Sequence, residues 1–215
     1  MAPARFITFE GGEGSGKSTQ ARLLADRLQA AGVDVVVTRE PGGSPFAEQV
    51  RALILDPATA PHSALSEALL FYAARADHLD RTIRPALGSG RWVICDRFSD
   101  STRVYQSVAG GLDAATIEAL EQLVVAPTAP DLTFILDLAP EAGLARAAVR
   151  RQAGAPTDAY ETRGLAFHER LRSGYQAIAA AEPGRCVLLD GALPIGRLAE
   201  LVWAEVTQRL LQGGA

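Results

Sequence analysis

The segment Gly11–Ser18, which reads GGEGSGKS, constrains the fold of this chain more than any other feature. It fits the pattern G-x-x-x-x-G-K-[ST] in full, and loops of this pattern cradle phosphate groups with their backbone N–H groups. Residues 5–10 form an apolar run typical of a short buried strand, and Leu24 and Leu28 lie one helical turn apart after the loop. A strand, a glycine loop and a helix in this order predict a nucleotide-binding α/β fold.

Lys17 is the only lysine of the chain, and every other strongly basic residue is an arginine. Its ammonium would reach the β- and γ-phosphates of ATP, while the Ser18 hydroxyl would hold Mg²⁺. The alternative is a glycine-rich turn with a chance lysine, and GC-rich codon usage would by itself make lysine scarce. We favour the phosphate loop because the whole pattern fits. The residues expected to contact ATP are Gly11, Gly12, Glu13, Gly14, Ser15, Gly16, Lys17, Ser18 and Thr19.

Size and composition bound the class of protein. With 215 residues, 48% of them hydrophobic, the chain can bury one sizeable core, so we expect a single domain over residues 1–215. A net charge of −4 without a long basic run argues against nucleic-acid polymers as partners, and no apolar run approaches the ~18 residues of a membrane span. The first strand leaves no room for a signal peptide, and Cys95 and Cys186 read as buried free thiols. We therefore expect a cytoplasmic enzyme.

Alternating strand and helix signals run along the chain. Apolar runs predict strands at residues 5–10, 33–39, 92–96, 132–138 and 186–190. Helices are expected between them, with starts at Ser44-Pro45, Asp113, Pro140 and Pro194. This alternation predicts an α/β fold with a doubly wound, five-stranded parallel sheet of the P-loop type.

Polar residues follow the expected strands. Ligands of open parallel sheets bind beyond the carboxyl ends of the strands. We therefore expect the polar strand ends to converge beside the phosphate loop, namely Glu10, Arg39, Glu40, Asp96 and Arg97. Asp96 is placed like a carboxylate that holds Mg²⁺ directly or through water. A strand-end cap for Asp96 and a surface ion pair for Arg97 are the alternatives. The chain has no asparagine, which argues against GTP-binding proteins and protein kinases because their signature motifs need one.

Four further segments carry longer motifs. They are Thr38–Gly43 with R-E-P-G-G, Leu70–Arg75 with L-F-x-A-x-R, Asp96–Gln106 with D-R-F-x-x-S…Y-Q, and Phe167–Tyr175 with F-H-E-R…G-Y. Together with the strand and loop at residues 6–18, they resemble the bacterial thymidylate kinases of the nucleoside-monophosphate kinase superfamily. The resemblance covers nearly the whole chain. It implies phosphoryl transfer from ATP·Mg²⁺ to dTMP, a helical lid and a homodimer.

The resemblance implies roles for residues around the base. Phe71 would stack on the thymine ring, and Arg75 would donate to a thymine carbonyl. Seen alone, Phe71 lies on an apolar helix and is more often a core residue than a stacking platform. His168 and Tyr175 are expected to be packing residues. The remaining residues that would line the nucleoside pocket are Ser101, Tyr105 and Gln106.

A second set would surround the acceptor phosphate and the sugar. Arg97 and Arg51 would grip the monophosphate, because a planar guanidinium matches phosphate oxygens. Glu13 would accept from the sugar 3′-hydroxyl, and Glu40 would lie near the acceptor phosphate and the metal. For Arg51, a solvated position on its helix is the alternative.

The chain departs from the family pattern at two places. Phe98 replaces the usual tyrosine after Asp-Arg, and the lid motif D-R-x-E becomes D-A-Y-E, with Ala159 where an arginine would stabilise the transferring phosphate. The loop at residues 152–157 belongs to this lid, which we expect over about residues 146–161. The expected substitutes for the missing arginine are Arg146, Arg150 and Arg151.

Three other functions stay open at this point. The nearest is another small kinase for a different nucleotide or for a nucleoside, although Phe71, Arg75 and Tyr105 favour dTMP. The second is a P-loop regulatory ATPase whose hydrolysis drives a partner. The third is a nucleotide-binding module without turnover.

Overall fold

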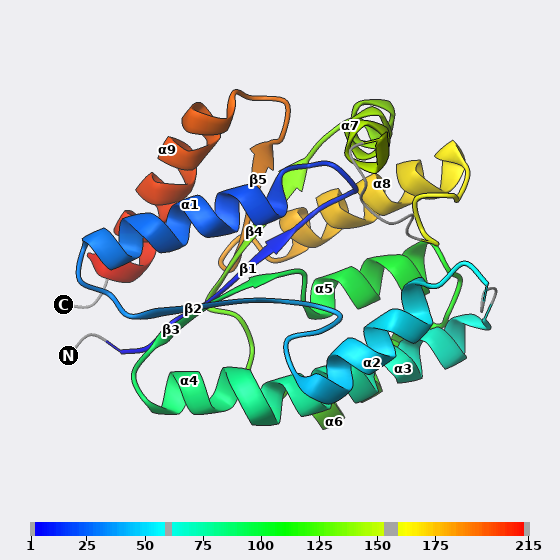
Figure 1. Ribbon diagram of the computed structural model, residues 1–215, viewed down its shortest axis with the longest axis horizontal. Coiled ribbons are helices and arrows are strands. Elements are labelled where there is room, and N and C mark those ends of the chain that lie inside the picture. Colours follow the sequence, from blue (N-terminus) through cyan, green and yellow to red (C-terminus); the bar gives the residue numbers. More distant parts are fainter. Residues whose placement is uncertain (1–2, 59–61, 153–158, 213–215) are drawn as a thin grey trace.

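A five-stranded parallel sheet forms the centre of the computed structural model, which describes residues 3–58, 62–152 and 159–212 (Figure 1). The strand order is β2-β3-β1-β4-β5, so the first strand lies in the middle. The strands are β1 Phe6–Glu10, β2 Val35–Arg39, β3 Trp92–Asp96, β4 Leu132–Asp137 and β5 Cys186–Asp190. The predicted fold class is confirmed, and the predicted strand ends differ by no more than two residues.

Helices cover both faces of this sheet (Figure 1). They are α1 Lys17–Ala30, α2 Pro45–Leu55, α3 Ala64–His78, α4 Arg84–Gly88, α5 Ser99–Thr102, α6 Ala114–Val124, α7 Pro140–Gln152, α8 Leu165–Ala181 and α9 Ile195–Val206. Three π-helical turns extend the helices, at Leu79–Ile83 between α3 and α4, at Arg103–Val108 after α5 and at Thr207–Leu211 after α9. None of the helices in the described ranges is long and apolar enough to cross a membrane.

Strand residues alternate between two cores, as the pleat of a strand requires. Ile7 and Phe9 of β1 face α1 and α9, whereas Phe6 packs with residues of α3 and α4 on the opposite face. The second face has another core under α8, which includes the fully buried Ile135 of β4. Burial on both sides explains why the strands are short, nearly continuous apolar runs.

The predicted helix starts have different caps. Ser44 accepts from Ala47 N at 3.3 Å, with Pro45 as the first helical residue of α2, as expected. Asp113 and Pro194 occupy the N-cap positions of α6 and α9, and neither side chain makes a capping hydrogen bond to the described residues. The cap of α2 matters most for the site, because a short loop, residues 40–44, joins this helix to the end of β2.

Candidate active site

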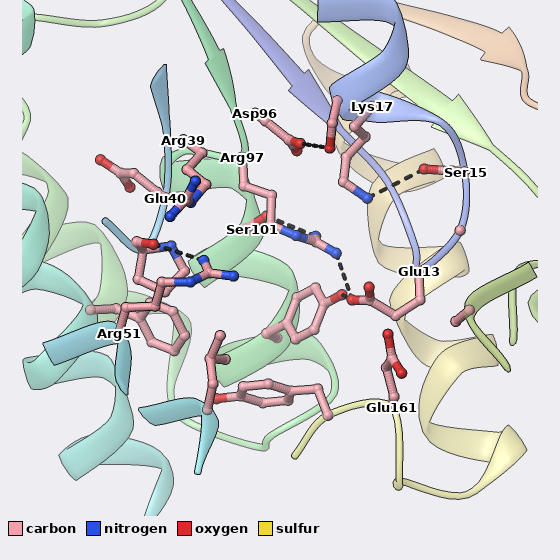
Figure 2. A pocket seen from close by; sticks show the side chains of 18 of the residues that line it. Glu13, Ser15, Lys17, Arg39, Glu40, Arg51, Asp96, Arg97, Ser101 and Glu161 are labelled. Carbon is pink, nitrogen blue, oxygen red and sulfur yellow. Dashed lines mark hydrogen bonds and ion pairs between the residues drawn. The ribbon is translucent and has the colours of Figure 1, made fainter. Parts of the chain in front are cut away.

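A cavity of about 750 Å³ opens at the carboxyl ends of β1, β2 and β3. Figure 2 shows Lys17 and Glu13 on one side of it, Arg97 in the middle, and Glu40 and Arg51 on the opposite side. Most of the residues singled out from the sequence meet here. The residues singled out from the sequence that line the cavity are Glu13, Gly14, Ser15, Gly16, Lys17, Ser18, Thr19, Glu40, Arg51, Phe71, Arg75, Asp96, Arg97, Ser101, Tyr105, Gln106, Arg150 and Arg151.

The lysine of the phosphate loop contacts backbone carbonyls of the same loop. Lys17 Nζ donates to Gly12 O at 2.7 Å and to Gly11 O at 3.2 Å, and α1 begins at Lys17 itself. Burial lowers the pKa of Lys17 to about 8, and the neighbouring Arg97 charge adds to this shift. A buried ammonium at a helix N-terminus is a ready partner for a polyanion, which would replace the carbonyl contacts.

Helix α7 packs directly against the backbone of the phosphate loop. Gly14 has a φ of +66°, which favours glycine, and a Cβ atom on Gly14 would overlap the carbonyl oxygen of Gly143. A Cβ atom on Gly143 would in turn overlap the carbonyl oxygen of Glu13. The two backbones therefore touch directly, and neither position has space for a side chain.

Ser18 and Asp96 form the candidate metal position. The Ser18 hydroxyl donates to Asp96 Oδ2, which brings one hydroxyl and one carboxylate together beside the phosphate loop. No group of three or more metal-ligating side chains occurs among the described residues. Two oxygen ligands nevertheless fit Mg²⁺, which uses one or two protein groups and completes its shell with waters and substrate phosphates.

Arg97 is the centre of the polar network. Its φ of +69° is unusual for a residue with a side chain, and it aims the guanidinium back across the loop. Nη2 donates to Glu13 Oε1 at 2.6 Å, and Nη1 donates to Gly11 O at 3.0 Å. Burial alone would raise the pKa of Glu13, but the charges of Arg97 and Lys17 and a hydrogen bond from Tyr105 outweigh it and lower that pKa to about 2.

Glu10 ends β1 next to the phosphate loop, where the sequence placed it, although no hydrogen-bonding role was assigned to it. It accepts from Phe98 N at 2.7 Å, Ser101 Oγ at 2.6 Å and Tyr175 OH at 3.2 Å. Burial and the charge of Asp100 raise the pKa of Glu10 to about 7. Tyr175 is buried as expected for a packing residue, yet its hydroxyl also contacts Arg97 at 3.3 Å. An acidic residue at the end of an otherwise apolar strand was the available signal.

Arg75 is almost completely buried, with 1% of its surface exposed. Its Nε donates to Glu40 Oε2 at 2.8 Å, and its Nη2 donates to Phe98 O at 3.1 Å and Thr102 Oγ1 at 3.0 Å. The third nitrogen, Nη1, is buried without a hydrogen-bond partner among the described residues. An unpaired buried donor is costly, so Nη1 is suited to a ligand acceptor.

Glu40 is held by two side chains of α3, one of which sequence analysis missed. Besides Arg75, it contacts His78 Nδ1 at 3.0 Å, and His78 Nε2 lies 2.7 Å from Thr38 Oγ1. His78 is fully buried, whereas Arg51 lies nearer the opening and donates to Pro41 O at 2.8 Å. The histidine precedes the π-helical turn after α3, and no local motif marked it.

The three lid arginines have different environments. Arg150 Nη2 lies 3.5 Å from Glu161 Oε1, Arg151 donates to Glu161 Oε2, and both arginines line the cavity. Arg146 does not line it and instead contacts Gly14 O at 3.3 Å and Gly191 O at 3.2 Å. Of the loop expected at residues 152–157, only Gln152 lies within the described residues.

Aromatic side chains and an amide line the part of the cavity beyond Arg97. Phe71 is half-buried, and its ring centre lies 6.4 Å from that of Tyr160, a residue with no assigned role in the sequence analysis. Tyr160 also meets Tyr105 edge-on at 5.3 Å. The cavity therefore joins a phosphate loop to a pocket with a flat apolar wall and buried polar groups. This combination defines a P-loop kinase that binds a second, small ligand next to the nucleotide.

Comparisons with known proteins narrow this class. The thymidylate kinase family model matches residues 9–202, so the chain belongs to the thymidylate kinase family. A thymidylate kinase of Nitrobacter winogradskyi is 53% identical over 98% of this chain and 91% of the relative, and one of Caulobacter vibrioides is 53% identical over 98% and 99%. The crystal structure of thymidylate kinase from Ehrlichia chaffeensis superimposes with a TM-score of 0.76 at 36% identity, covering 95% of this chain and 99% of that one.

Proposed function

We propose that this enzyme transfers the γ-phosphoryl group of ATP to dTMP, giving ADP and dTDP, a step in dTTP synthesis. The observation that carries this proposal is the continuity of one cavity from Lys17 to the unpaired Nη1 of Arg75. The acceptor is already a phosphate dianion near neutral pH. No strong general base is needed, and catalysis consists of positioning and charge neutralisation.

On the donor side, the phosphate loop receives the triphosphate of ATP. Lys17 exchanges its contacts with the Gly11 and Gly12 carbonyls for the β- and γ-phosphates. Ser18 and Asp96 are the residues that would hold Mg²⁺. When bound, this ion neutralises charge that develops on the phosphate oxygens.

On the acceptor side, Arg97 and Arg51 hold the monophosphate of dTMP. The Glu13 carboxylate accepts a hydrogen bond from the sugar 3′-hydroxyl. At the same time it holds the Arg97 guanidinium, whose Nη2 lies 2.6 Å from Glu13 Oε1. Glu40 keeps its position near the phosphate through Arg75 at 2.8 Å. The chain thus uses buried ion pairs to hold its cations ready for a dianion.

The base of dTMP occupies the far end of the cavity. Phe71 stacks on the thymine ring, and the free Arg75 Nη1–H donates to a thymine carbonyl. Ser101, Tyr105 and Gln106 line the sugar and the remaining edge of the base. Cytosine presents an amino group instead of this carbonyl and would leave Nη1 unpaired, so dCMP is rejected more strongly than dUMP.

The transition-state cation comes from α7, because Ala159 cannot supply it. Arg150 and Arg151 are the leading candidates, since both line the cavity and are held by Glu161. Arg146 contacts the phosphate-loop carbonyl of Gly14 and is the third candidate. A lid arginine that meets the transferring phosphoryl group would act like the arginine fingers of other P-loop enzymes.

The enzyme is a homodimer in the cytoplasm under this proposal. The adjacent helices α2 and α3 expose Leu53, Leu65 and Leu69 by 42–49%, which is a candidate face for a second copy. Both cysteines are free thiols, which suits a reducing compartment. Light scattering after gel filtration measures the dimer, and a monomer at micromolar concentration would refute it.

A coupled ADP-release assay against a panel of nucleoside monophosphates tests the function. The expected order of kcat/KM is dTMP, then dUMP, then dCMP and the purine monophosphates. The 5-methyl group is one apolar contact worth ~1–3 kcal/mol, so dUMP is a poorer but measurable substrate. A preference for AMP, CMP or GMP would overturn the substrate, and ATP hydrolysis that no acceptor stimulates would indicate a regulatory ATPase.

A further inference from the structure

A buried carboxylate outside the cavity is bonded to the amide of the base pocket. Glu67 of α3 is 8% exposed and does not line the cavity. Its Oε2 accepts from Gln106 Nε2 at 3.2 Å and from Tyr160 OH at 3.0 Å, and its Oε1 accepts from Arg163 Nη2 at 3.3 Å. The carboxylate thus links α3 to the π-helical turn after α5 and to the segment before α8.

This arrangement engages the amide nitrogen of Gln106. Nε2 donates to Glu67 Oε2 and to Tyr160 OH, each at 3.2 Å, and the Tyr160 hydroxyl donates to Glu67. The oxygens of Glu67 accept hydrogen bonds from all three partners, so they select the NH₂ side of the amide and exclude its carbonyl side. The carbonyl oxygen, Gln106 Oε1, is left buried and without a partner among the described residues.

We propose that Glu67 is a specificity-determining positioning residue, which turns Gln106 so that only an acceptor is offered to the base. This inference rests on the proposed transfer to dTMP and names how its pyrimidine edge is recognised. Thymine carries a hydrogen on N3 and an oxygen on C4, whereas cytosine carries a lone pair on N3 and an amino group on C4. A fixed Oε1 acceptor therefore suits the thymine N3–H and opposes the cytosine N3 lone pair.

The two unpaired groups of the pocket match this edge together. Arg75 Nη1 is an unpaired donor and Gln106 Oε1 is an unpaired acceptor, and both residues line the same cavity. A donor and an acceptor in one cavity are complementary to the carbonyl and imino groups of thymine or uracil. Cytosine mismatches both groups at once, so the site discriminates by unpaired polar atoms as well as by shape.

The substitution Glu67→Gln tests the inference, because an amide at position 67 can donate as well as accept and frees Gln106 to turn over. We expect kcat/KM for dTMP to fall about tenfold, mainly through KM, and the dTMP/dCMP ratio to fall by at least as much. The dTMP/dUMP ratio should not change, since uracil has the same N3 and C4 groups. KM for ATP should also be unchanged, as should all constants of the charge-matched control Glu118→Gln on the exposed face of α6.

Two further variants keep the test decisive if Glu67→Gln folds poorly. Tyr160→Phe removes one partner of the amide and keeps the ring, so it should lower the dTMP/dCMP ratio in the same direction. In a Gln106→Ala background, Glu67→Gln should no longer change that ratio, because its effect passes through the amide. A wild-type enzyme that fails to phosphorylate dTMP would refute the proposed function. An active wild type whose dTMP/dCMP ratio survives Glu67→Gln and Tyr160→Phe would refute only the role of Glu67.

Discussion

The ionisation of Lys17 makes ATP binding a proton-linked reaction. In the free enzyme the pKa of this lysine is lowered to about 8, first by burial and then by the Arg97 charge, while Glu13, Asp96 and Glu10 raise it. A bound triphosphate adds several negative charges at hydrogen-bond distance and returns the pKa to at least its ordinary value of about 10.4. The complex then binds more protons than the free enzyme between pH 8 and pH 10. ATP binding must therefore take up protons in this range, and affinity must fall as the pH rises.

The size of the effect follows from the pKa. With a pKa of about 8, the free enzyme is about one-tenth deprotonated at pH 7, half at pH 8 and nine-tenths at pH 9. Uptake should therefore be ~0.1, ~0.5 and ~0.9 proton per ATP at these pH values, and affinity should fall towards tenfold per pH unit above pH 8. MgATP is itself fully ionised above pH 8, so it adds no proton of its own.

Isothermal titration calorimetry measures this uptake directly when ATP is titrated in buffers that differ in ionisation enthalpy. Lys17→Arg is the matched control, because arginine keeps its charge at every pH of the experiment and should bind ATP without the uptake. Glu10, whose pKa is about 7, is present in both proteins and cancels in the comparison. Binding enthalpies at pH 8.5 that do not depend on the buffer, or an equal uptake in Lys17→Arg, would show that Lys17 does not meet the phosphates.

Three further predictions concern other parts of the site. Lys17→Ala should lose roughly 10³-fold in turnover, and an amine-selective reagent should inactivate the enzyme unless ATP is present; normal turnover of the variant would contradict the phosphate loop. Alanine at Arg150 or Arg151 should reduce turnover at saturating ATP and dTMP far more than it weakens binding, and normal turnover of the triple variant that includes Arg146 would refute the α7 cation. His78→Ala removes two buried hydrogen bonds, one to a carboxylate, so it should destabilise the fold by ~2–4 kcal/mol in urea unfolding and raise KM for dTMP; unchanged stability would show that the histidine does not hold Glu40.

Sequence analysis predicted those parts of the site whose residues lie within one short segment of the chain. Lys17 and Ser18 are neighbours within a single motif, and Asp96 ends a strand that pairs directly with β1. Hydrophobic patterns likewise predicted all five strands, because parallel strands buried on both faces leave uninterrupted apolar runs. The roles of Arg51, Phe71 and Arg75 came from the family resemblance, since nothing in their local composition distinguishes them from helix residues that face a core or solvent.

The parts that were missed depend on partners distant in the sequence. Glu67 and Tyr160 are 93 positions apart, and Glu10 and Tyr175 are 165 apart. A carboxylate in a helix is an ordinary surface residue until the fold surrounds it, so its pattern carries no signal. Arg146 illustrates the opposite case: it lies one helical turn before Arg150 in α7, yet its guanidinium contacts the carbonyls of Gly14 and Gly191 and does not line the cavity.

The direct backbone contact between Gly14 and Gly143 has a consequence for protein engineering. Any library that randomises either codon should return only glycine, because every other residue places an atom on a carbonyl oxygen. Efforts to retune donor selectivity would therefore lose nearly all their variants at these two positions. Ala147 lies one turn further along the same helix and lines the cavity. It offers the designer a way to alter the donor side while the contact between the phosphate loop and the helix stays intact.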